Sequence, residues 1–369
     1  MDTDRIRVAV IGLGHWGAHA HLPALAARGD VEVVALVDTR TDTLLPIAEQ
    51  YGIRQTYSDV DTLFREVVGL DAIVLATPTD THHDVVMEAF GAGLHVLCEK
   101  PLAYDLRQAH EMVDAARSSK RVGKMGFLFR SSPVVERMKQ LIDEGYIGEV
   151  KLFESVTLNA QFVDPQKPLH WKMQRARANG GVFVEYGSHS IDLALWFGGP
   201  ITSVVAHGVT LVPERSNQDG AMRAVDVDDA ASWIATYGSG AEALFRTGWA
   251  SLPVGGGGMR IYGSRGSLAW QLDPTTRRSE KLLASTLAEP EPHVLLDFAP
   301  PFDSQTDAGT FPLGLLARYN KRLGDSFVND IRDGQASGPT FEDGLAAQRV
   351  LAAIRTSLDE RRWVEIDTE

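Results

Sequence analysis

The chain has 369 residues, which is longer than one hydrophobic core usually supports, so we expect two domains. Of these residues 44% are hydrophobic and 23% charged, a balance typical of a globular protein. Its net charge of −13 opposes nucleic-acid binding, because affinity for phosphate backbones comes from cationic groups. No apolar run approaches the ~20 residues that cross a bilayer, the first four residues are acidic rather than signal-like, and the single Cys98 has no partner for an internal disulfide. We therefore expect a cytoplasmic protein with neither nucleic acid nor membrane as a partner.

Residues 1–126 alternate strand and helix patterns, which predicts an α/β domain with a doubly wound parallel sheet, the Rossmann arrangement. The expected strands are 7–11, 31–37, 72–75, 95–98 and one at 123–126, and the expected helices are 16–27, 43–51, 60–66, 82–91 and 106–118. Pro23 lies inside the first helix pattern, where it removes a backbone donor and predicts a bend.

Residues 127–369 form the second predicted domain, which is of α+β class with an open, mainly antiparallel sheet, and which we expect to bind substrate and to mediate oligomerisation. The expected elements are strands at 150–158, 201–211, 230–237, 241–251, 259–262, 267–271 and 363–366, an arm or surface loop at 288–312, and helices at 181–197, 315–334 and 341–361. The last helix is expected to pack back on the Rossmann domain. Apolar residues alternate in 241–246 on a face that no helix is expected to cover, so we expect a homodimer or homotetramer.

A G-x-G-x-x-G motif, formed by Gly12, Gly14 and Gly17, directly follows an apolar, β-branched run. This is the context of a dinucleotide-binding turn: the first glycine permits the tight turn, the second lets the backbone approach a pyrophosphate, and the third lets the helix pack on the strand. The pyrophosphate is expected on the free N–H groups of the helix that begins near His15 and Trp16.

The second strand pattern ends in Asp38, whose carboxylate is suited to accept hydrogen bonds from the ribose hydroxyls of NAD. Thr39 and Arg40 follow, and the guanidinium of Arg40 is suited to hold the 2′-phosphate of NADP. The sequence predicts NAD and leaves NADP open. The alternative interpretation of Asp38 is an ordinary turn residue at the end of a strand.

The segment with Thr77, Pro78 and His82 follows the next buried strand, at the carboxyl edge of the sheet where open α/β sheets bind ligands. Pro78 is expected to shape a turn that lays the backbone along the cofactor. His82 is equally well explained as a cofactor contact or as an ordinary residue at the start of a helix.

The segment Glu99-Lys100-Pro101 follows the neighbouring strand at the same edge and is expected to contact the cofactor. The Lys100 ammonium is expected in the nicotinamide crevice, where it can donate to a substrate hydroxyl or carbonyl. The alternative is a solvated lysine paired with Glu99.

Three polar residues lie within the apolar helix pattern 181–197: Glu185, His189 and Asp192, spaced to share one helical face. Because their neighbours are apolar, this polar stripe is expected inside the protein or against a cavity, where such groups need partners. A neutral His189 can accept a proton while Glu185 or Asp192 holds the ring. The alternatives are a buried network without catalysis and, as the last choice, a metal site. Because no other His or Cys residues group with these three in the sequence, we expect no metal.

Polar groups around an aromatic surface suit a carbohydrate, which offers hydroxyls and an apolar C–H face. The expected substrate-binding residues are Arg130, Asn159, His170, Trp171, Lys172 and Tyr186, together with Lys100, His189 and Asp192. His170 and Trp171 are equally compatible with loop packing or a subunit contact.

Taken together, five motifs resemble the Gfo/Idh/MocA family along nearly the whole chain: G-x-G-x-x-G, Thr-Pro-x-x-x-His, Glu-Lys-Pro, the Gly-Gly…His-x-x-Asp helix, and a closing helix at 338–353. The resemblance implies an NAD(P)-dependent enzyme acting on a secondary alcohol of a sugar, polyol or related ring. It implies that Lys100 polarises the reacting oxygen, that His189 is the acid/base, that Asp192 contacts substrate or His189, and that a cis peptide bond precedes Pro101. The chain departs from the family at Glu185, where Asp is usual, so that this carboxylate lies one methylene further out.

We therefore expect a dehydrogenase that oxidises a secondary hydroxyl of a sugar, inositol or related polyol by hydride transfer to nicotinamide. Two other functions remain open: an NAD-dependent enzyme that cleaves or isomerises a glycoside through transient oxidation, and a non-catalytic sensor of NAD(P) or a metabolite. The presence of both Lys100 and His189 argues against the sensor, which has no need of an acid/base pair.

Overall fold

The structure is a computed structural model that describes residues 5–217, 219–252, 257–273, 278–300 and 314–368. The acidic first four residues and residues 301–312 of the expected arm lie outside the described residues. The chain divides into two compact units, one of Met1–Ser131 with Asp303–Leu345, the other of Ser132–Phe302 with Ala346–Glu369. Residues 303–345, which sequence order placed in the second domain, therefore group with the first unit.

The strands of the first unit, as far as it is described, form one six-stranded parallel sheet in the order β3-β2-β1-β4-β5-β6. They are β1 (Ile6–Ile11), β2 (Val31–Val37), β3 (Gln55–Tyr57), β4 (Ala72–Leu75), β5 (His95–Cys98) and β6 (Gly123–Met125). The predicted doubly wound sheet is confirmed, and β3 is a strand that the sequence analysis missed. The order reverses between β1 and β4, so their carboxyl ends border the crevice where such sheets bind ligands.

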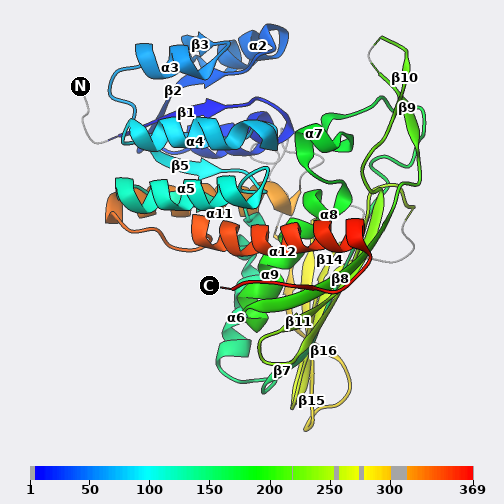
Figure 1. The fold of residues 1–369 in the computed structure, drawn as a ribbon. Coiled ribbons are helices and arrows are strands. Elements are labelled where there is room, and N and C mark those ends of the chain that lie inside the picture. The colour runs from blue at the N-terminus through cyan, green and yellow to red at the C-terminus, as the bar shows by residue number, and fades with distance from the viewer. Residues whose placement is uncertain (1–4, 218, 253–256, 274–277, 301–313, 369) are drawn as a thin grey trace. The chain divides into compact units, whose positions relative to one another are not determined.

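Helices flank this sheet (Figure 1). They are η1 (Gly17–His21), α1 (Leu22–Ala26), α2 (Thr41–Tyr51), α3 (Val60–Glu66), η2 (Thr79–Thr81), α4 (His82–Gly91), α5 (Leu106–Ser119), η3 (Leu128–Ser131) and α11 (Leu315–Asp333). Helices α4 and α5 pack side by side, and α11 packs on η1, α1 and η3. Pro23 lies in the first turn of α1, directly after the π-helical turn η1, where its missing N–H costs little. The expected single helix 16–27 is thus two elements.

The second unit is built on a nine-stranded sheet over the residues described, in the order β16-β15-β14-β13-β7-β12-β11-β8-β17. Its strands are β7 (Val150–Leu158), β8 (Ile201–Val209), β11 (Ala230–Tyr237), β12 (Glu242–Gly248), β13 (Gly258–Gly263), β14 (Gly266–Leu272), β15 (Glu280–Thr286), β16 (His293–Phe298) and β17 (Val364–Glu365). Only β7 and β12 pair in parallel among these described strands, which confirms a mainly antiparallel sheet. The prediction of an arm or loop at 288–312 is wrong at residues 293–298, which pair with β15 as β16. A separate hairpin joins β9 (Glu214–Ser216) to β10 (Met222–Ala224).

Helices α6 (Pro133–Asp143), α8 (Val182–Glu185) and α9 (Gly187–Gly198) pack against this large sheet. Shorter helical segments η4 (Trp171–Met173) and α7 (Arg175–Ala178) precede them. The last helix, α12 (Phe341–Glu360), belongs to the first unit up to Leu345 and to the second from Ala346.

Phe245 of β12 faces the helices, contrary to expectation. Phe245 is buried and stacks on Trp233 of β11 with ring centroids 4.8 Å apart, and Trp233 in turn lies against Gly187 of α9. Since successive side chains of a strand point to opposite faces, the other face of β12 presents half-buried Leu244 and exposed Arg246. The prediction that the alternating apolar residues of 241–246 lie on an uncovered face is therefore wrong for Phe245.

Candidate active site

The glycine turn connects β1 to the helix that begins at His15. Gly12 has φ +90°, and a Cβ there would lie 2.6 Å from the carbonyl oxygen of Ala76; a Cβ at Gly17 would lie 1.8 Å from the Gly12 oxygen. At Gly14, by contrast, a Cβ would meet nothing within 4 Å. Two of the glycines are thus required by packing, and the third borders open space, as a backbone cradle for a pyrophosphate requires.

Asp38 follows β2 and is buried. Its Oδ2 accepts a 2.7 Å hydrogen bond from the Leu13 N–H, and its Oδ1 accepts from the Arg40 N–H at 2.9 Å. The exposed Arg40 guanidinium also contacts this carboxylate at 3.1 Å. Burial raises the pKa of Asp38, but the hydrogen bonds from Arg40 and Leu13 outweigh it and leave the pKa below its usual value. An ionised carboxylate beside the glycine turn fits the ribose of a dinucleotide, and Thr39 beside it is exposed.

His82 joins two of the predicted clusters. It is buried at the start of α4, with Nε2 3.0 Å from the Thr77 oxygen and Nδ1 3.0 Å from the Pro101 oxygen. Burial lowers the pKa of its imidazole, which the hydrogen bonds to the Thr77 and Pro101 carbonyl oxygens oppose. His82 therefore links the loop of Thr77 and Pro78 to the loop after β5.

Lys100 and Glu99 are both buried at the carboxyl end of β5. This excludes the alternative of a solvated strand-end lysine. The Lys100–Pro101 peptide bond is cis, as the family resemblance implied.

Sequence reasoning missed a partner of Glu99, His21, and the residue that contacts His21 in turn, Asn320. His21 of η1 lies with Nε2 2.8 Å from Glu99 Oε1, and Asn320 of α11 lies with Nδ2 3.3 Å from Nδ1 of the same imidazole. All three side chains are buried. Asn320 is almost 300 residues away in sequence, so no local pattern could have indicated this contact.

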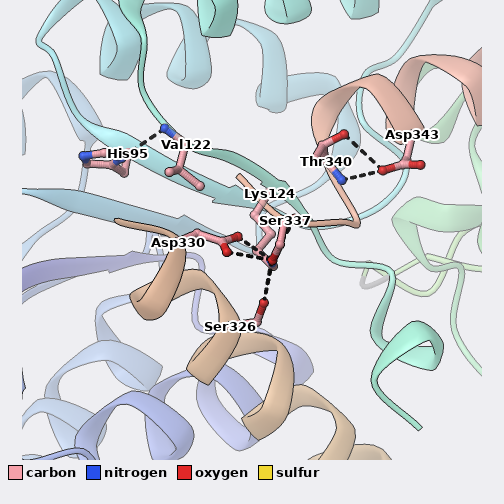
Figure 2. A network of polar contacts seen from close by, with 8 residues as sticks. All are labelled: His95, Val122, Lys124, Ser326, Asp330, Ser337, Thr340 and Asp343. Atoms are coloured by element: carbon pink, nitrogen blue, oxygen red, sulfur yellow. Dashed lines mark hydrogen bonds and ion pairs between the residues drawn. The ribbon is translucent and has the colours of Figure 1, made fainter. Parts of the chain in front are cut away.

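A buried lysine in β6 was also missed. Lys124 is fully buried, and its Nζ lies 2.6 Å from Asp330 and 2.7 Å from Ser326 of α11. The Nζ also lies 3.0 Å from the carbonyl oxygen of Ser337, and Figure 2 shows these residues around Lys124. Burial lowers the pKa of its ammonium, which the Asp330 carboxylate opposes. This ion pair joins the end of α11 to the edge strand of the sheet.

Arg130 of η3, expected to bind substrate, is buried and donates from Nη2 to Asp343 at 2.9 Å. Asp343 also accepts from the N–H of Thr340 at 2.7 Å, at the start of α12. Within the first unit, Arg130 therefore ties η3 to the segment that leads into α12; its role towards substrate stays a prediction.

In the second unit, the expected helix 181–197 is interrupted at Tyr186 and forms α8 and α9. Glu185 ends α8, whereas His189 and Asp192 are buried in α9. Asp228 caps α8 from a distant segment: its carboxylate accepts from the N–H groups of Gly181 at 3.0 Å and Phe183 at 3.1 Å. The sequence analysis missed Asp228, because a cap donated from another segment leaves no local signal.

Glu185 forms an ion pair with Lys172, with Oε1 2.6 Å from Nζ. The Lys172 ammonium also lies 5.7 Å from the ring centroid of Trp171. The structure thus brings together three residues that the sequence analysis assigned separately to catalysis and to substrate binding.

His170 precedes this pair and packs on Phe162, with ring centroids 5.9 Å apart. Burial and the nearby Lys172 charge lower the pKa of His170 to about 4, so the ring is neutral at physiological pH. Tyr186 donates from its hydroxyl to Gln161, and the Asn159 side chain accepts from the Gln161 N–H at 2.9 Å. These expected substrate residues, His170, Tyr186 and Asn159, therefore all contact Gln161 or Phe162 of one loop in the second unit.

Within the part of the chain that is described, no helix is long and apolar enough to cross a membrane, and no group of three His, Cys, Asp or Glu residues is disposed to hold a metal ion.

Two family models match the chain. Residues 6–127 match the oxidoreductase family with an NAD-binding Rossmann fold, and residues 135–269 match the GFO/IDH/MocA C-terminal domain. The chain is 27% identical to levoglucosan dehydrogenase of Pseudarthrobacter phenanthrenivorans, covering 93% of this chain and 90% of that protein. It is 26% identical to myo-inositol 2-dehydrogenase of Thermotoga maritima, covering 98% and 99%.

Solved structures agree with these matches. An oxidoreductase domain protein from Kribbella flavida is 28% identical with a TM-score of 0.86, over 99% of this chain and 100% of that one. Levoglucosan dehydrogenase in complex with NADH and levoglucosan has the same fold, with a TM-score of 0.86 at 24% identity, over 99% and 100% of the two chains.

Proposed function

Since the chain belongs to the Gfo/Idh/MocA family of oxidoreductases with an NAD-binding Rossmann fold, we propose that it oxidises a secondary hydroxyl of a sugar, inositol or related polyol. Two related proteins of nearly the same length are a levoglucosan dehydrogenase and a myo-inositol 2-dehydrogenase. Both names describe oxidation of a cyclic polyhydroxylated compound, which supports the substrate class.

The observation that carries this proposal is the position of Lys100. Its side chain is buried at the carboxyl end of β5, at the same sheet edge as the glycine turn after β1. An ammonium buried at that edge is placed where open α/β sheets bind their ligands.

Each chemistry-bearing residue has a separate proposed role. Lys100 donates a hydrogen bond to the reacting oxygen and stabilises the negative charge that develops on it. His189 removes the hydroxyl proton, and Asp192 holds the imidazole or a substrate hydroxyl. NAD, when bound, supplies hydride acceptance, and the open backbone at Gly14 with the ionised carboxylate of Asp38 fits its pyrophosphate and ribose.

Glu185 has a different proposed role. Its ion pair with Lys172 neutralises its charge, so we assign it to substrate positioning rather than to proton transfer. The Glu185 side chain is one methylene longer than the Asp usual in the family, and its carboxylate contacts Lys172.

The test begins with a screen of levoglucosan, inositols and common sugars with NAD and NADP, monitored at 340 nm. Lys100→Met is expected to lower kcat on the best substrate by roughly 10²- to 10⁴-fold, because the developing alkoxide loses its charge partner. The matched control is Lys321→Met, since Lys321 is an exposed lysine of the same unit paired with Asp325 on the surface. Wild-type turnover in Lys100→Met would refute the role of Lys100.

His189→Ala tests the acid/base in the second unit. We expect kcat to fall roughly 10²- to 10⁴-fold while NADH affinity stays within about twofold, because the imidazole acts on a proton rather than on the cofactor. His207→Ala, at an exposed histidine of β8, is the control. Product formation without any change at 340 nm would instead favour the glycoside-cleaving or isomerising alternative, and tight cofactor binding without turnover would favour the sensor.

A further inference from the structure

The backbone of Lys100 is held by the carboxylate that precedes it. The last hydrogen bond between β5 and β4 runs from the Glu99 N–H to the Leu75 oxygen at 2.9 Å. The next amide along the chain, the Lys100 N–H, donates instead to Glu99 Oε2 at 3.2 Å. Gly126 closes the space behind this side chain: a Cβ there would lie 2.9 Å from Glu99 Cδ. The Glu99 carboxylate therefore has little freedom to move.

The other oxygen of the same carboxylate is held by His21, with Nε2 2.8 Å from Oε1. The exposed fractions of the His21 and Glu99 side chains are 2% and 7%, so the contact is shielded from water and is stronger than the same contact on the surface. His21 ends η1, the π-helical turn that begins at Gly17 of the glycine motif. A carboxylate thus bridges the cofactor-binding turn and the strand end that carries Lys100.

Asn320 contacts the other nitrogen of the His21 ring, with its Nδ2 3.3 Å from Nδ1. The Glu99 carboxylate accepts from Nε2–H, because an ionised carboxylate has no proton to donate. Asn320 lies on α11, which packs on η1. The ring orientation is therefore set by an element outside the sheet.

We propose that His21 is a positioning residue. It acts through Glu99 to align the ammonium of Lys100 with the cofactor-binding turn. This inference rests on the role of Lys100 in the proposed function. The bridge matters because displacement of a reacting group by about 1 Å can cost roughly 100-fold in rate. Because the bridge contacts neither the open backbone at Gly14 nor Asp38, we expect it to affect kcat more than cofactor affinity.

Two substitutions at one position separate hydrogen bonding from packing. In His21→Gln the side-chain amide nitrogen reaches the place of Nε2 and keeps the donor to Glu99. In His21→Asn the side chain ends at the place of Nδ1 and keeps only the contact with Asn320. Both variants are polar and smaller than or similar to histidine, so each is a control for the other.

The first readout needs neither substrate nor cofactor. Amide hydrogen exchange at Lys100, measured on the full-length protein, is expected to be about tenfold faster in His21→Asn than in wild type, because the freed carboxylate no longer holds that N–H. His21→Gln is expected to match wild type within about threefold. Equal exchange in wild type and His21→Asn would overturn the proposal.

The second readout divides kcat from binding. We expect His21→Asn to lower kcat roughly 10- to 100-fold with the NADH dissociation constant within about twofold, and His21→Gln to retain most of kcat. An equal fall in both variants would assign the effect to packing and overturn the proposal.

Glu99→Gln completes a double-mutant cycle with His21→Asn. The glutamine side chain has one acceptor oxygen, whereas the Glu99 carboxylate accepts from both His21 and the Lys100 N–H. The double variant His21→Asn/Glu99→Gln is expected to be no slower than the slower single variant, because both changes break one bridge. Additive losses would show that the two residues act independently. If Lys100→Met keeps full turnover, the proposed function fails while the exchange result still decides the bridge.

Discussion

Individual buried charges in this protein are accompanied by specific hydrogen-bond partners. Asp38 accepts from two backbone N–H groups and a guanidinium, and Asp228 accepts from the first amides of α8. Burial raises the pKa of Asp228, which those amides oppose, whereas at Asp38 the hydrogen bonds win. The difference follows first from the deeper burial of the Asp228 carboxylate and then from Arg40, which hydrogen-bonds Asp38 directly.

His95, at the start of β5, makes the stability of the first unit dependent on pH. Burial, aided by the Arg121 charge, lowers its pKa to about 4, and its Nδ1 accepts from the Val122 N–H at 3.0 Å (Figure 2). The unfolded chain binds this proton below a pH of about 6.5 and the native state does not, so stability is lost as pH falls from about 6.5 to about 4.

The test is His95→Asn, in which Oδ1 replaces Nδ1 as the acceptor and cannot titrate. Between pH 7 and pH 5, wild type is expected to lose about 2 kcal/mol more stability than the variant. His170 titrates in the same direction in both proteins and cancels from the comparison. Identical pH profiles of unfolding, measured by urea titration, would contradict this prediction.

Among the elements, the turn between β1 and η1 contains two glycines that packing requires and a third, Gly14, that we expect to serve cofactor binding. A Cβ at Gly17 would collide with the Gly12 oxygen, whereas a Cβ at Gly14 meets nothing within 4 Å. The cofactor-binding role and the packing role of the motif are therefore separable by substitution.

Gly14→Ala is expected to melt within about 1 °C of wild type but to bind NADH roughly tenfold or more weakly, because the methyl group enters the pyrophosphate cradle. Gly17→Ala is expected to lower the melting temperature by about 4 °C or more, since overpacking costs about 1–3 kcal/mol. Differential scanning calorimetry and NADH fluorescence titration measure the two effects. Unchanged NADH affinity in Gly14→Ala would remove this glycine from the cofactor site.

The contact between β6 and α11 depends on a buried ion pair, Lys124 with Asp330. Lys124→Met leaves the Asp330 charge without its ammonium and is expected to cost about 3–5 kcal/mol of unfolding free energy. The double variant Lys124→Met/Asp330→Leu is expected to recover most of this loss, since no buried charge then remains at the contact. Urea unfolding of the single and double variants gives the comparison; a double variant no more stable than Lys124→Met would show that the pair contributes more than charge balance.

At the scale of the whole molecule, the nine-stranded sheet presents a face of mixed character away from α9. Leu244 and Ile234 are neighbours on that face and are half-buried, with exposed Arg246 beside them. A homodimer or homotetramer remains our prediction. Multi-angle light scattering is expected to give two or four times the mass of one chain, and the mass of a single chain would contradict it.

Local patterns in the sequence were sufficient to predict the parallel sheet of the first unit, because each of its main strands is a short apolar run followed by a helix with its own period. They failed at β3, β15 and β16, which are short or half-exposed strands whose alternation is weak. They also failed at the end of α8, where Tyr186 interrupts a helix whose spacing is otherwise regular.

What the sequence by itself determined is the family and a set of candidate residues: the glycine turn, Asp38, Glu99-Lys100-Pro101 and the Glu185 to Asp192 segment. Residue types and local spacing suffice for that prediction, because turn geometry and strand ends are local properties. Only the tertiary structure decided what holds these residues, as with His21 at Glu99, Asn320 at His21, and Lys172 at Glu185. Such partners come from segments far apart in the chain, and the burial that makes their contacts strong exists only after folding.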